Sequence, residues 1–262
     1  MAATTAPEPR YLEVGGTRVR IFSRPEFFGR RWKYKAGEAV TFLAPTQDGK
    51  TTLAFQLLQH TVSERLPAVV LVMKPRDPTP AAWTRHLGFT ETPTWPPPKQ
   101  WPWEKKVTGH TLWPRHTFVV EVDNAHITAE FTKAIQWAYQ HGNCILFVDE
   151  VYGVIAELDG LEDDLIAIWS RGSGMGTGLW AATQRPAGSA GHGVPGFMYS
   201  NSTHLFLSKD PDARSRQRYG EIGGIDPQLI SRVVMKLRRY QFLYIRKADE
   251  HGGPYLAIID AS

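Results

Sequence analysis

Nine consecutive residues of the chain have the types and the order that hold a triphosphate. They read Ala44-Pro45-Thr46-Gln47-Asp48-Gly49-Lys50-Thr51-Thr52, between a strand-forming run and a run with helical spacing. In such a loop, backbone N–H groups wrap the β-phosphate and the following helix N-terminus adds partial positive charge. The Lys50 ammonium would reach the β- and γ-phosphates, and the Thr51 hydroxyl would bind Mg²⁺. The segment therefore predicts an ATP site, with Mg²⁺ as the accompanying ion.

The segment departs from the usual phosphate-loop pattern at its first position, where Ala44 replaces a glycine. Alanine suffices there if its φ is negative, so the substitution leaves the mechanism intact. Gly49 still allows the backbone to approach the phosphate where a Cβ would collide. We expect the nucleotide-binding residues to be Ala44, Thr46, Gln47, Asp48, Gly49, Lys50, Thr51 and Thr52.

A pair of acidic residues follows a second apolar run about a hundred residues downstream. The run Cys144–Val148 reads as a buried strand, and it ends at Asp149 and Glu150. Ligands of open α/β sheets bind at the carboxyl ends of the strands, so these carboxylates are expected beside the phosphate loop. Asp149 would hold the Mg²⁺ shell together with Thr51, and Glu150 would act as general base on the attacking water. In isolation the pair would be a solvated strand end, but the upstream loop favours a hydrolytic site.

A third candidate lies in the segment Ala181-Ala182-Thr183-Gln184-Arg185-Pro186, at the end of the next expected strand. The Gln184 amide could hydrogen-bond both the γ-phosphate region and the water that attacks it. It would then report the nucleotide state to the loop that follows.

The apolar pattern predicts strands that alternate with helices. The expected strands are 39–43, 69–73, 117–122, 144–148, 179–183, 203–207, 242–246 and 256–259. The expected helices run from 50 to before Pro67 and over 127–140, 162–169 and 227–239. Ahead of them, the segment 11–23 alternates as a short N-terminal hairpin that turns at Gly15-Gly16. This order predicts an α/β fold with a mainly parallel sheet and helices on both faces.

The segment 90–116 is rich in proline and tryptophan. We expect a long surface excursion without helix or sheet, because proline fixes φ and lacks an N–H donor. Its tryptophans, Trp95, Trp101, Trp103 and Trp113, could form an interface patch or attach the loop to the body of the protein. The second interpretation is favoured, because an indole left in water is costly.

The composition indicates one large globular domain. The 262 residues, 42% of them hydrophobic, fit a flexible tail at 1–10 and a single domain over 11–262. The single cysteine, Cys144, excludes a disulfide framework and favours a reducing compartment. No run of 18 apolar residues and no signal-peptide pattern occurs, so a soluble, cytoplasmic protein without a transmembrane segment is expected. The nine histidines show no metal-ligand spacing, and no zinc site is expected.

The net charge of +4 permits a polyanionic partner without requiring one. The residues that could contact nucleic-acid phosphates fall into two groups, Arg214, Arg216 and Arg218, and Lys236, Arg238 and Arg239. For the second group, favourable charge at a helix C-terminus is the preferred explanation. The glycine-rich run Gly172–Gly178 precedes a strand and opens no helix, so we expect a flexible connector and no dinucleotide site.

The three motifs together resemble the FtsK/HerA superfamily of DNA-pumping ATPases. The most specific mark is Thr183-Gln184-Arg185-Pro186, which ends the next expected strand after the one that leads to Asp149-Glu150. The resemblance covers 39–260. Within the superfamily the chain is most similar to the viral and phage genome-packaging ATPases. The resemblance implies a RecA-like P-loop core and a homo-oligomeric ring, a hexamer or a pentamer, with double-stranded DNA in its pore. It also admits a capsid portal or vertex protein as partner, in the host cytoplasm or at the virion vertex.

The resemblance further implies an arginine that reaches the ATP of a neighbouring subunit. Ser173 stands where the family often has that arginine, but Arg171 lies two residues earlier. Arg214, in Ser208–Arg214, resembles an S-K-x-D-S-R segment of chromosome translocases with one residue inserted. Such an arginine stabilises charge that develops during hydrolysis. Both remain candidates, and a surface salt bridge is the alternative for either.

Two other functions fit the sequence. A conjugation or plasmid-mobilisation ATPase would use the same motor parts, and neighbouring genes would distinguish it. A non-motor P-loop protein, such as a small-molecule kinase or a nucleotide-gated regulatory module, would need no ring. The Asp149-Glu150 pair favours activation of water over phosphoryl transfer to a metabolite.

Overall fold

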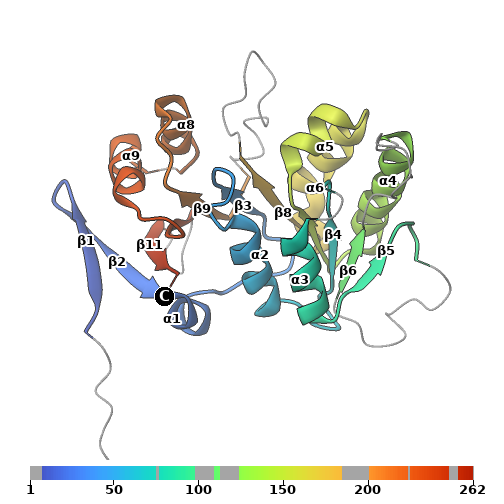
Figure 1. Ribbon diagram of the computed structural model, residues 1–262, viewed down its shortest axis with the longest axis horizontal. Coiled ribbons are helices and arrows are strands. Elements are labelled where there is room, and N and C mark those ends of the chain that lie inside the picture. Colours follow the sequence, from blue (N-terminus) through green and yellow to red (C-terminus); the bar gives the residue numbers. More distant parts are fainter. Residues whose placement is uncertain are drawn as a thin grey trace, which may run out of the picture.

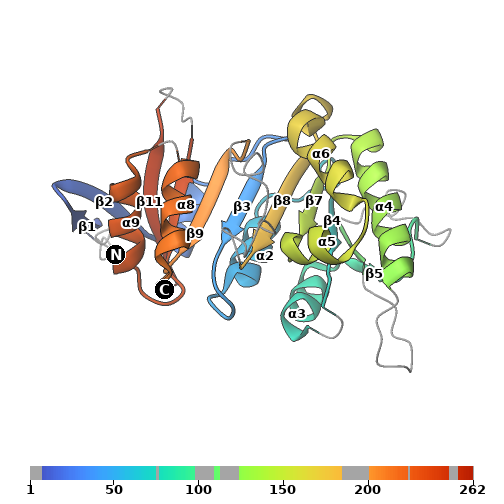
Figure 2. The ribbon, with the colours of Figure 1, turned by 90° about the horizontal axis from the view of Figure 1, so that it is seen from above.

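The computed structural model of the chain describes residues 8–74, 77–97, 109–112, 124–184, 201–223, 225–247 and 253–261. Within them, eleven strands form one sheet. In order across the sheet they are β1 (Arg10–Val14), β2 (Thr17–Ser23), β11 (Tyr255–Asp260), β10 (Phe242–Arg246), β9 (His204–Ser208), β3 (Val40–Leu43), β8 (Gly178–Thr183), β7 (Ile145–Val148), β4 (Ala68–Leu71), β6 (Gly109–Leu112) and β5 (Thr90–Thr92). Seen from above, the sheet extends from the β1–β2 hairpin at one end to β5 at the other (Figure 2).

The seven strands from β9 to β5 are all parallel, and this part of the sheet positions the candidate site. Leu43 of β3 pairs with Thr183 of β8, and Val148 of β7 pairs with Ala181 of β8. The carboxyl ends of β3, β8 and β7 therefore meet at one edge. Beyond β9, β10 runs antiparallel to both of its neighbours. The prediction of a mainly parallel sheet is confirmed.

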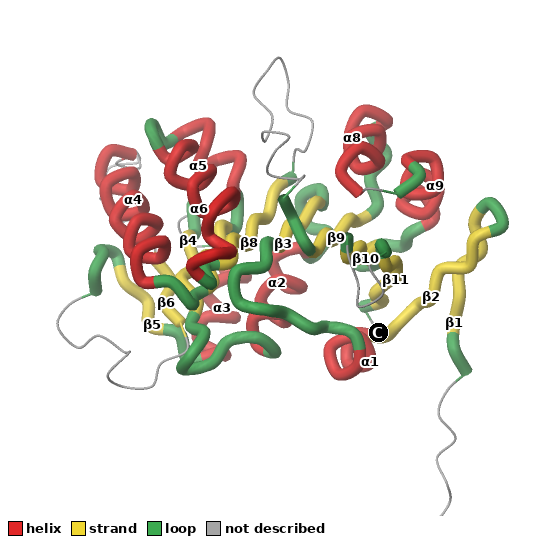
Figure 3. Tube along the Cα trace, turned by 180° about the vertical axis from the view of Figure 1, so that it is seen from behind, coloured by secondary structure: helices red, strands yellow, loops and turns green. Residues whose placement is uncertain are grey.

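Helices cover both faces of the sheet, as expected (Figure 1). One face carries α1 (Arg24–Arg30), α2 (Lys50–Gln59) and α3 (Pro78–Leu87). The other carries α4 (Asn124–His141), α5 (Val151–Glu157), α6 (Leu161–Met175), α8 (Ala213–Gly223) and α9 (Pro227–Lys236). The view from behind shows the same two layers, with the hairpin and α4 at opposite ends (Figure 3). No helix in the described part of the chain is long and apolar enough to span a bilayer.

The two helical layers give two apolar cores, because successive residues of a strand point to opposite faces. In β3, Val40 and Phe42 pack in the core under α1 and α2, whereas Leu43 packs in the core under α4, α6 and α9. In β4, Val70 belongs to the first core and Leu71 to the second. The central strands are buried on both sides, which explains their continuous apolar sequences.

The N-terminal hairpin is confirmed. Its two strands pair in antiparallel register from Arg10↔Ile21 to Val14↔Thr17. The turn residues Gly15 and Gly16 have φ of 57° and 80°, the left-handed values that a two-residue hairpin turn requires.

Two expectations about loops are wrong. The described parts of the segment 90–116 include the strands β5 and β6, which extend the parallel sheet beyond β4. The residues Thr90–Thr92 and Gly109–Leu112 contain no proline, so their backbones are free to pair. The glycine run from Gly172 is also no connector, because α6 continues to Met175 and ends at Gly176, which has φ of 71°. A Cβ on Gly172 would lie 2.5 Å from the Thr177 carbonyl oxygen, so this glycine permits close packing of helix end and strand.

Trp95 supports the idea that indoles attach the proline-rich segment to the body. Its side chain is 3% exposed, and its ring centroid lies 5.3 Å from that of Trp137 on α4. Its backbone N–H donates to the carboxylate of Glu130, also on α4. Trp101, Trp103, Trp113 and the expected strand 117–122 lie outside the described residues.

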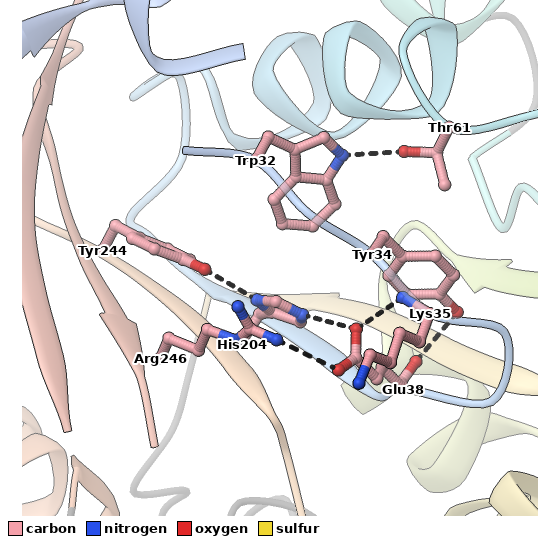
Figure 4. Close-up of polar contacts among 8 residues, drawn as sticks. All are labelled: Trp32, Tyr34, Lys35, Glu38, Thr61, His204, Tyr244 and Arg246. Carbon is pink, nitrogen blue, oxygen red and sulfur yellow. Dashed lines mark hydrogen bonds and ion pairs between the residues drawn. The ribbon is translucent and has the colours of Figure 1, made fainter. Parts of the chain in front are cut away.

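A buried polar network lies at the sheet edge opposite the carboxyl ends of the parallel strands (Figure 4). His204 is fully buried, with Nε2 3.0 Å from Glu38 Oε2 and Nδ1 2.8 Å from the Tyr244 hydroxyl. A neutral imidazole satisfies both contacts, because Nε2–H donates to the carboxylate and Nδ1 accepts from the phenol. The Arg246 guanidinium lies 3.6 Å from the other Glu38 oxygen, and the Lys35 N–H donates to Oε2.

This network predicts a loss of stability in mild acid. Burial lowers the pKa of His204, although the Glu38 carboxylate opposes that shift. The folded protein therefore binds a proton at His204 less readily than the unfolded chain does. The free energy of unfolding has its full value above the unfolded-state pKa of about 6.5 and falls as the pH drops below it. Below that pKa, we expect His204 to make the free energy of unfolding fall by up to about 1.4 kcal/mol for each pH unit. This dependence should be absent in His204→Gln. Glutamine can still donate to Glu38.

The measurement is urea unfolding of both proteins between pH 5 and pH 8. Burial alone would raise the pKa of Glu38, but its hydrogen bonds and ion pairs with His204, Lys35 and Arg246 outweigh burial and lower the pKa. Its own contribution is lost only near or below its unfolded-state pKa of about 4.3, outside this window. Equal pH slopes for the two proteins would contradict the neutral assignment of His204.

Candidate functional site

The loop between β3 and α2 has the backbone shape of a phosphate loop. Gln47 and Gly49 have φ of 65° and 84°, so the chain turns tightly before α2 begins at Lys50. Ala44 does not share this conformation, and its N–H donates to the Thr183 carbonyl oxygen at 3.3 Å. Alanine therefore fits the first position because its φ is not positive. Its side chain packs in the core beneath α2.

The two expected Mg²⁺ ligands are in contact. The Thr51 hydroxyl, in the first turn of α2, donates to Asp149 Oδ1 at 2.8 Å, just beyond the end of β7. Burial raises the pKa of Asp149, while the Thr51 hydrogen bond and the Lys50 charge act in the opposite direction. A hydroxyl and a carboxylate are the oxygen donors that Mg²⁺ prefers, and a buried carboxylate gains from a cation. The residues present thus fit Mg²⁺.

Lys50 and Glu150 form an ion pair beside those ligands. Lys50 Nζ lies 4.0 Å from Glu150 Oε2, and both side chains are largely buried. Burial lowers the pKa of Lys50, and the charges of Glu150 and Asp149 oppose this. Burial likewise raises the pKa of Glu150. Apart from the ion pair with Lys50, Glu150 Oε2 is buried and has no hydrogen-bond partner among the described residues.

Gln184 is also at the site. It follows β8, and its Oε1 accepts a hydrogen bond from the Thr46 hydroxyl at 2.6 Å. The pairing of β3 with β8 brings these residues together across 138 positions of sequence. Gln184 is therefore in direct contact with the phosphate loop.

Most of these residues line one cavity of about 460 Å³. This volume is within the range of about 300–1,000 Å³ found for small-molecule sites. The lining residues are Thr46, Gln47, Gly49, Lys50, Thr51, Thr52, Lys74, Asp77, Thr79, Asp149, Gln184 and Tyr240. Of the predicted site residues on the P-loop and after β7, Ala44, Asp48 and Glu150 do not line the cavity.

The chain resembles solved structures of ATPases, although no protein-family model and no curated protein matches its sequence. The DNA-packaging ATPase B204 from Sulfolobus turreted icosahedral virus has a TM-score of 0.58 at 13% identity, covering 86% of this chain and 98% of that chain. The genome packaging NTPase B204 from Sulfolobus turreted icosahedral virus 2, in complex with sulfate, has a TM-score of 0.56 at 11% identity, covering 86% and 97%. The fold is that of the RecA-like P-loop ATPases.

The same fold occurs in a larger protein. EssC (ATPases 2 and 3) from Geobacillus thermodenitrificans has a TM-score of 0.54 at 12% identity, and the match covers 87% of this chain but 40% of that one. Each of these similarities shows the fold. The RecA-like P-loop fold implied by the resemblance of the motifs is thus confirmed.

The P-loop ATPase cavity contains four residues that the sequence motifs do not identify. Lys74 follows β4, whose carboxyl end lies next to that of β7, and its charge acts on Lys50, Asp149 and Glu150. Asp77 accepts a hydrogen bond from the Thr79 N–H and caps α3. The Asp77-Pro78 pair is a helix-start signal in the sequence, which could have placed these residues at the strand's end. The fourth, Tyr240, precedes β10 and has no motif.

Neither candidate trans-acting arginine lines the cavity of its own chain. Arg171 is exposed on the last part of α6, with its guanidinium 5.8 Å from the Tyr139 ring centroid. Arg214 is exposed in the first turn of α8, and its backbone N–H donates to Asp212 Oδ1 at 3.2 Å. Arg214 follows the carboxyl end of β9, on the cavity edge, whereas α6 ends where β8 begins, at the opposite edge.

Most of the other basic residues have partners within the chain. Arg216 donates to the Asp210 carbonyl oxygen at 2.9 Å, and Lys236 to that of Glu13 at 3.2 Å. Arg238 pairs with Asp260 at 3.2 Å. These contacts attach α8 to the segment that precedes it, α9 to β1, and the turn after α9 to β11. The basic end of α9 therefore stabilises the fold.

Proposed function

We propose that the chain hydrolyses ATP and uses the energy to translocate double-stranded DNA, as a subunit of a viral genome-packaging motor. One observation carries the hydrolytic part: the Thr51–Asp149 hydrogen bond lies beside the Lys50–Glu150 ion pair, at the cavity that Lys50, Thr51 and Asp149 line. The similarity to B204, a DNA-packaging ATPase, over nearly the whole of both chains supports the packaging part. The B204 of Sulfolobus turreted icosahedral virus 2 also has structures in complex with AMPPCP and with ATP-gammaS.

In this proposal the P-loop backbone and Lys50 bind the phosphates, and Thr51 and Asp149 hold Mg²⁺. The ion, when bound, neutralises charge on the β- and γ-phosphates. Lys50 leaves Glu150 for the phosphates, and the Glu150 carboxylate then accepts a proton from the attacking water. Burial raises the pKa of Glu150, which makes its carboxylate a stronger base. Gln184 orients that water. When the γ-phosphate is lost, Gln184 transmits this change in nucleotide state to the segment after β8.

The active form would be a homo-oligomeric ring, hexameric or pentameric, around the DNA. The exposure of both Arg171 and Arg214, outside their own cavity, leaves either available to the site of a neighbour. In a virus the ring would contact a capsid portal or vertex protein and act in the host cytoplasm. A ring repeats each phosphate contact in every subunit, so a net charge of +4 per chain is compatible with strong DNA binding.

The test is the ATPase rate as a function of DNA and salt. We expect linear double-stranded DNA to raise the rate several-fold at about 50 mM salt, because DNA would be bound in the ring. That stimulation should be largely lost at about 200 mM salt, since binding to phosphates releases counterions. The measurement is phosphate release with linear DNA, with an equal mass of heparin as a polyanion control.

The same rate at all DNA concentrations, with a normal basal rate, would refute the motor and leave an ATPase of another kind. Equal stimulation by heparin would show a response to charge alone, and it would also count against translocation. Sizing with a non-hydrolysable ATP analogue separates the ring from a monomeric P-loop protein, which would stay at the mass of one chain.

A further inference from the structure

One side of the nucleotide cavity has no role in binding phosphate. Lys50, Thr51 and Asp149 account for phosphates and metal. Lys74 and Asp77 lie with them, because their charges act on Lys50 and Asp149. A nucleotide also has a flat, largely apolar base, which needs a different surface. Among the described residues that line the cavity, Tyr240 is the single aromatic one.

Tyr240 is packed against the loop that would hold the phosphates. A Cβ built on Gly49 would lie 3.1 Å from Cδ1 of the Tyr240 ring. The ring therefore uses space that the missing side chain of Gly49 leaves at the start of α2. The Tyr240 side chain is nonetheless 39% exposed, so the ring is accessible from the cavity.

The backbone of Tyr240 is held in an unfavourable conformation. Its φ of 66° is in the left-handed region, which a bulky aromatic residue rarely adopts. The buried Arg24 donates to the Tyr240 carbonyl oxygen at 3.4 Å and to Gln56 of α2 at 2.7 Å. The turn is closed by the Gln241 N–H, which donates to the Arg238 carbonyl oxygen at 3.1 Å. Strain maintained by surrounding contacts is typical of functional positions.

The ring already takes part in one stacking interaction. The Arg239 guanidinium lies over it, 4.8 Å from the ring centroid. A guanidinium on one face of an aromatic ring leaves the other face for a second flat group. Nucleic-acid bases stack on aromatic side chains in this way, and any base can do so because each has a flat π-face.

We propose that Tyr240 is the platform on which the base of the bound nucleotide stacks, on the ring face opposite Arg239. Phosphates at Lys50 and the base at Tyr240 would place the nucleotide along the cavity, with its α-phosphate near Thr51 and Thr52. Arg24 is a positioning residue, since it acts through the carbonyl group of Tyr240. This inference rests on the nucleotide binding in the proposed function and is independent of DNA.

The test compares ATP with inorganic tripolyphosphate, which carries the phosphates without the base. Affinities of both are measured by titration calorimetry for wild type, Tyr240→Asn and Tyr240→Phe. Asparagine accepts a left-handed backbone but provides no ring, and phenylalanine keeps the ring without the hydroxyl. We expect Tyr240→Asn to weaken ATP binding about ten-fold or more and to change tripolyphosphate binding less than about two-fold. Tyr240→Phe should bind ATP as wild type does.

Three outcomes would overturn the platform. Equal weakening of ATP and tripolyphosphate by Tyr240→Asn would mean that the ring only supports the loop. Unchanged ATP binding in that variant, or equal affinity of wild type for the two ligands, would mean that the base is not stacked there. A wild-type protein that binds neither ligand would instead refute the nucleotide site itself, and the platform with it.

Photolabelling with 8-azido-ATP gives a second readout. We expect the label on the peptide that contains Tyr240, with protection by excess ATP and no protection by tripolyphosphate at low concentration. A label confined to the peptide that contains Lys74 would place the base at the other end of the cavity, and would overturn the assignment.

Discussion

Replacing Glu150 with glutamine is expected to stop ATP turnover while leaving ATP bound. Glutamine has nearly the same shape but cannot accept the proton of the attacking water, and general-base catalysis contributes about 10²- to 10⁴-fold. Binding should persist because the P-loop backbone, Lys50 and Thr51 are unchanged. It should even tighten slightly, since the Lys50–Glu150 ion pair no longer competes with the phosphates. The measurements are phosphate release and the Kd of a fluorescent ATP analogue.

The matched control is Lys50→Ala, which removes the cation that holds the phosphates. It should lose binding as well as turnover, so the two variants separate chemistry from affinity. The prediction fails if Glu150→Gln turns over ATP at more than about a tenth of the wild-type rate. Another carboxylate would then have to be the base, and Asp77 and Asp149 are the two that line the cavity.

The parts of the site that could be predicted from the sequence are local. The P-loop is one continuous segment, and its strand-to-helix context follows from the apolar pattern on either side. Asp149 and Gln184 could be placed with it because each ends a strand, and the carboxyl ends of parallel strands share an edge. The contacts Thr51–Asp149 and Thr46–Gln184 bear this out.

The parts that could not be predicted depend on packing between distant segments. Tyr240 reaches Gly49 only because β10 lies two strands from β3 and the α9–β10 turn folds back over the loop. No pattern around Tyr240 encodes that approach. The sequence pattern also does not predict the helices α1, α3, α5 and α8. They are short or polar, and α8 has a strongly charged sequence that is stabilised by its contact with α9 rather than by its own periodicity.

The same limit applies to the glycine run at the end of α6. Composition alone favours a loop, because glycine destabilises a helix interior. Here the glycines are needed where α6 meets the start of β8: a Cβ on Gly178 would overlap the Tyr34 hydroxyl. The close approach of α6, β8 and the segment that contains Tyr34 outweighs the low helix propensity of glycine. Arg171 therefore lies on a continuous helix.

The position of Arg171 on α6 is relevant to which arginine acts on a neighbouring subunit. An arginine is effective only if it is held firmly, because its guanidinium must meet the γ-phosphate as charge develops. Arg171 has a rigid helix beneath it and lies at the edge opposite its own nucleotide. Arg214 begins α8, at the cavity edge, next to the Asp212 carboxylate that accepts its N–H. A ring could use either.

We expect Arg171→Ala or Arg214→Ala, whichever removes the trans-acting residue, to lower the rate about 10³-fold or more, as measured for arginines of this kind. Its own P-loop, Lys50 and Glu150 remain intact, so ATP binding should be unchanged. Mixed with Glu150→Gln subunits, the inactive arginine variant should recover part of the rate. Some interfaces then combine an intact Glu150 with an intact arginine from the neighbour. The exposed Arg65, replaced by alanine, is the control and should keep the full rate. If neither arginine variant loses activity, or if no mixing ratio restores any, the site is complete within one chain and the shared-site ring is wrong.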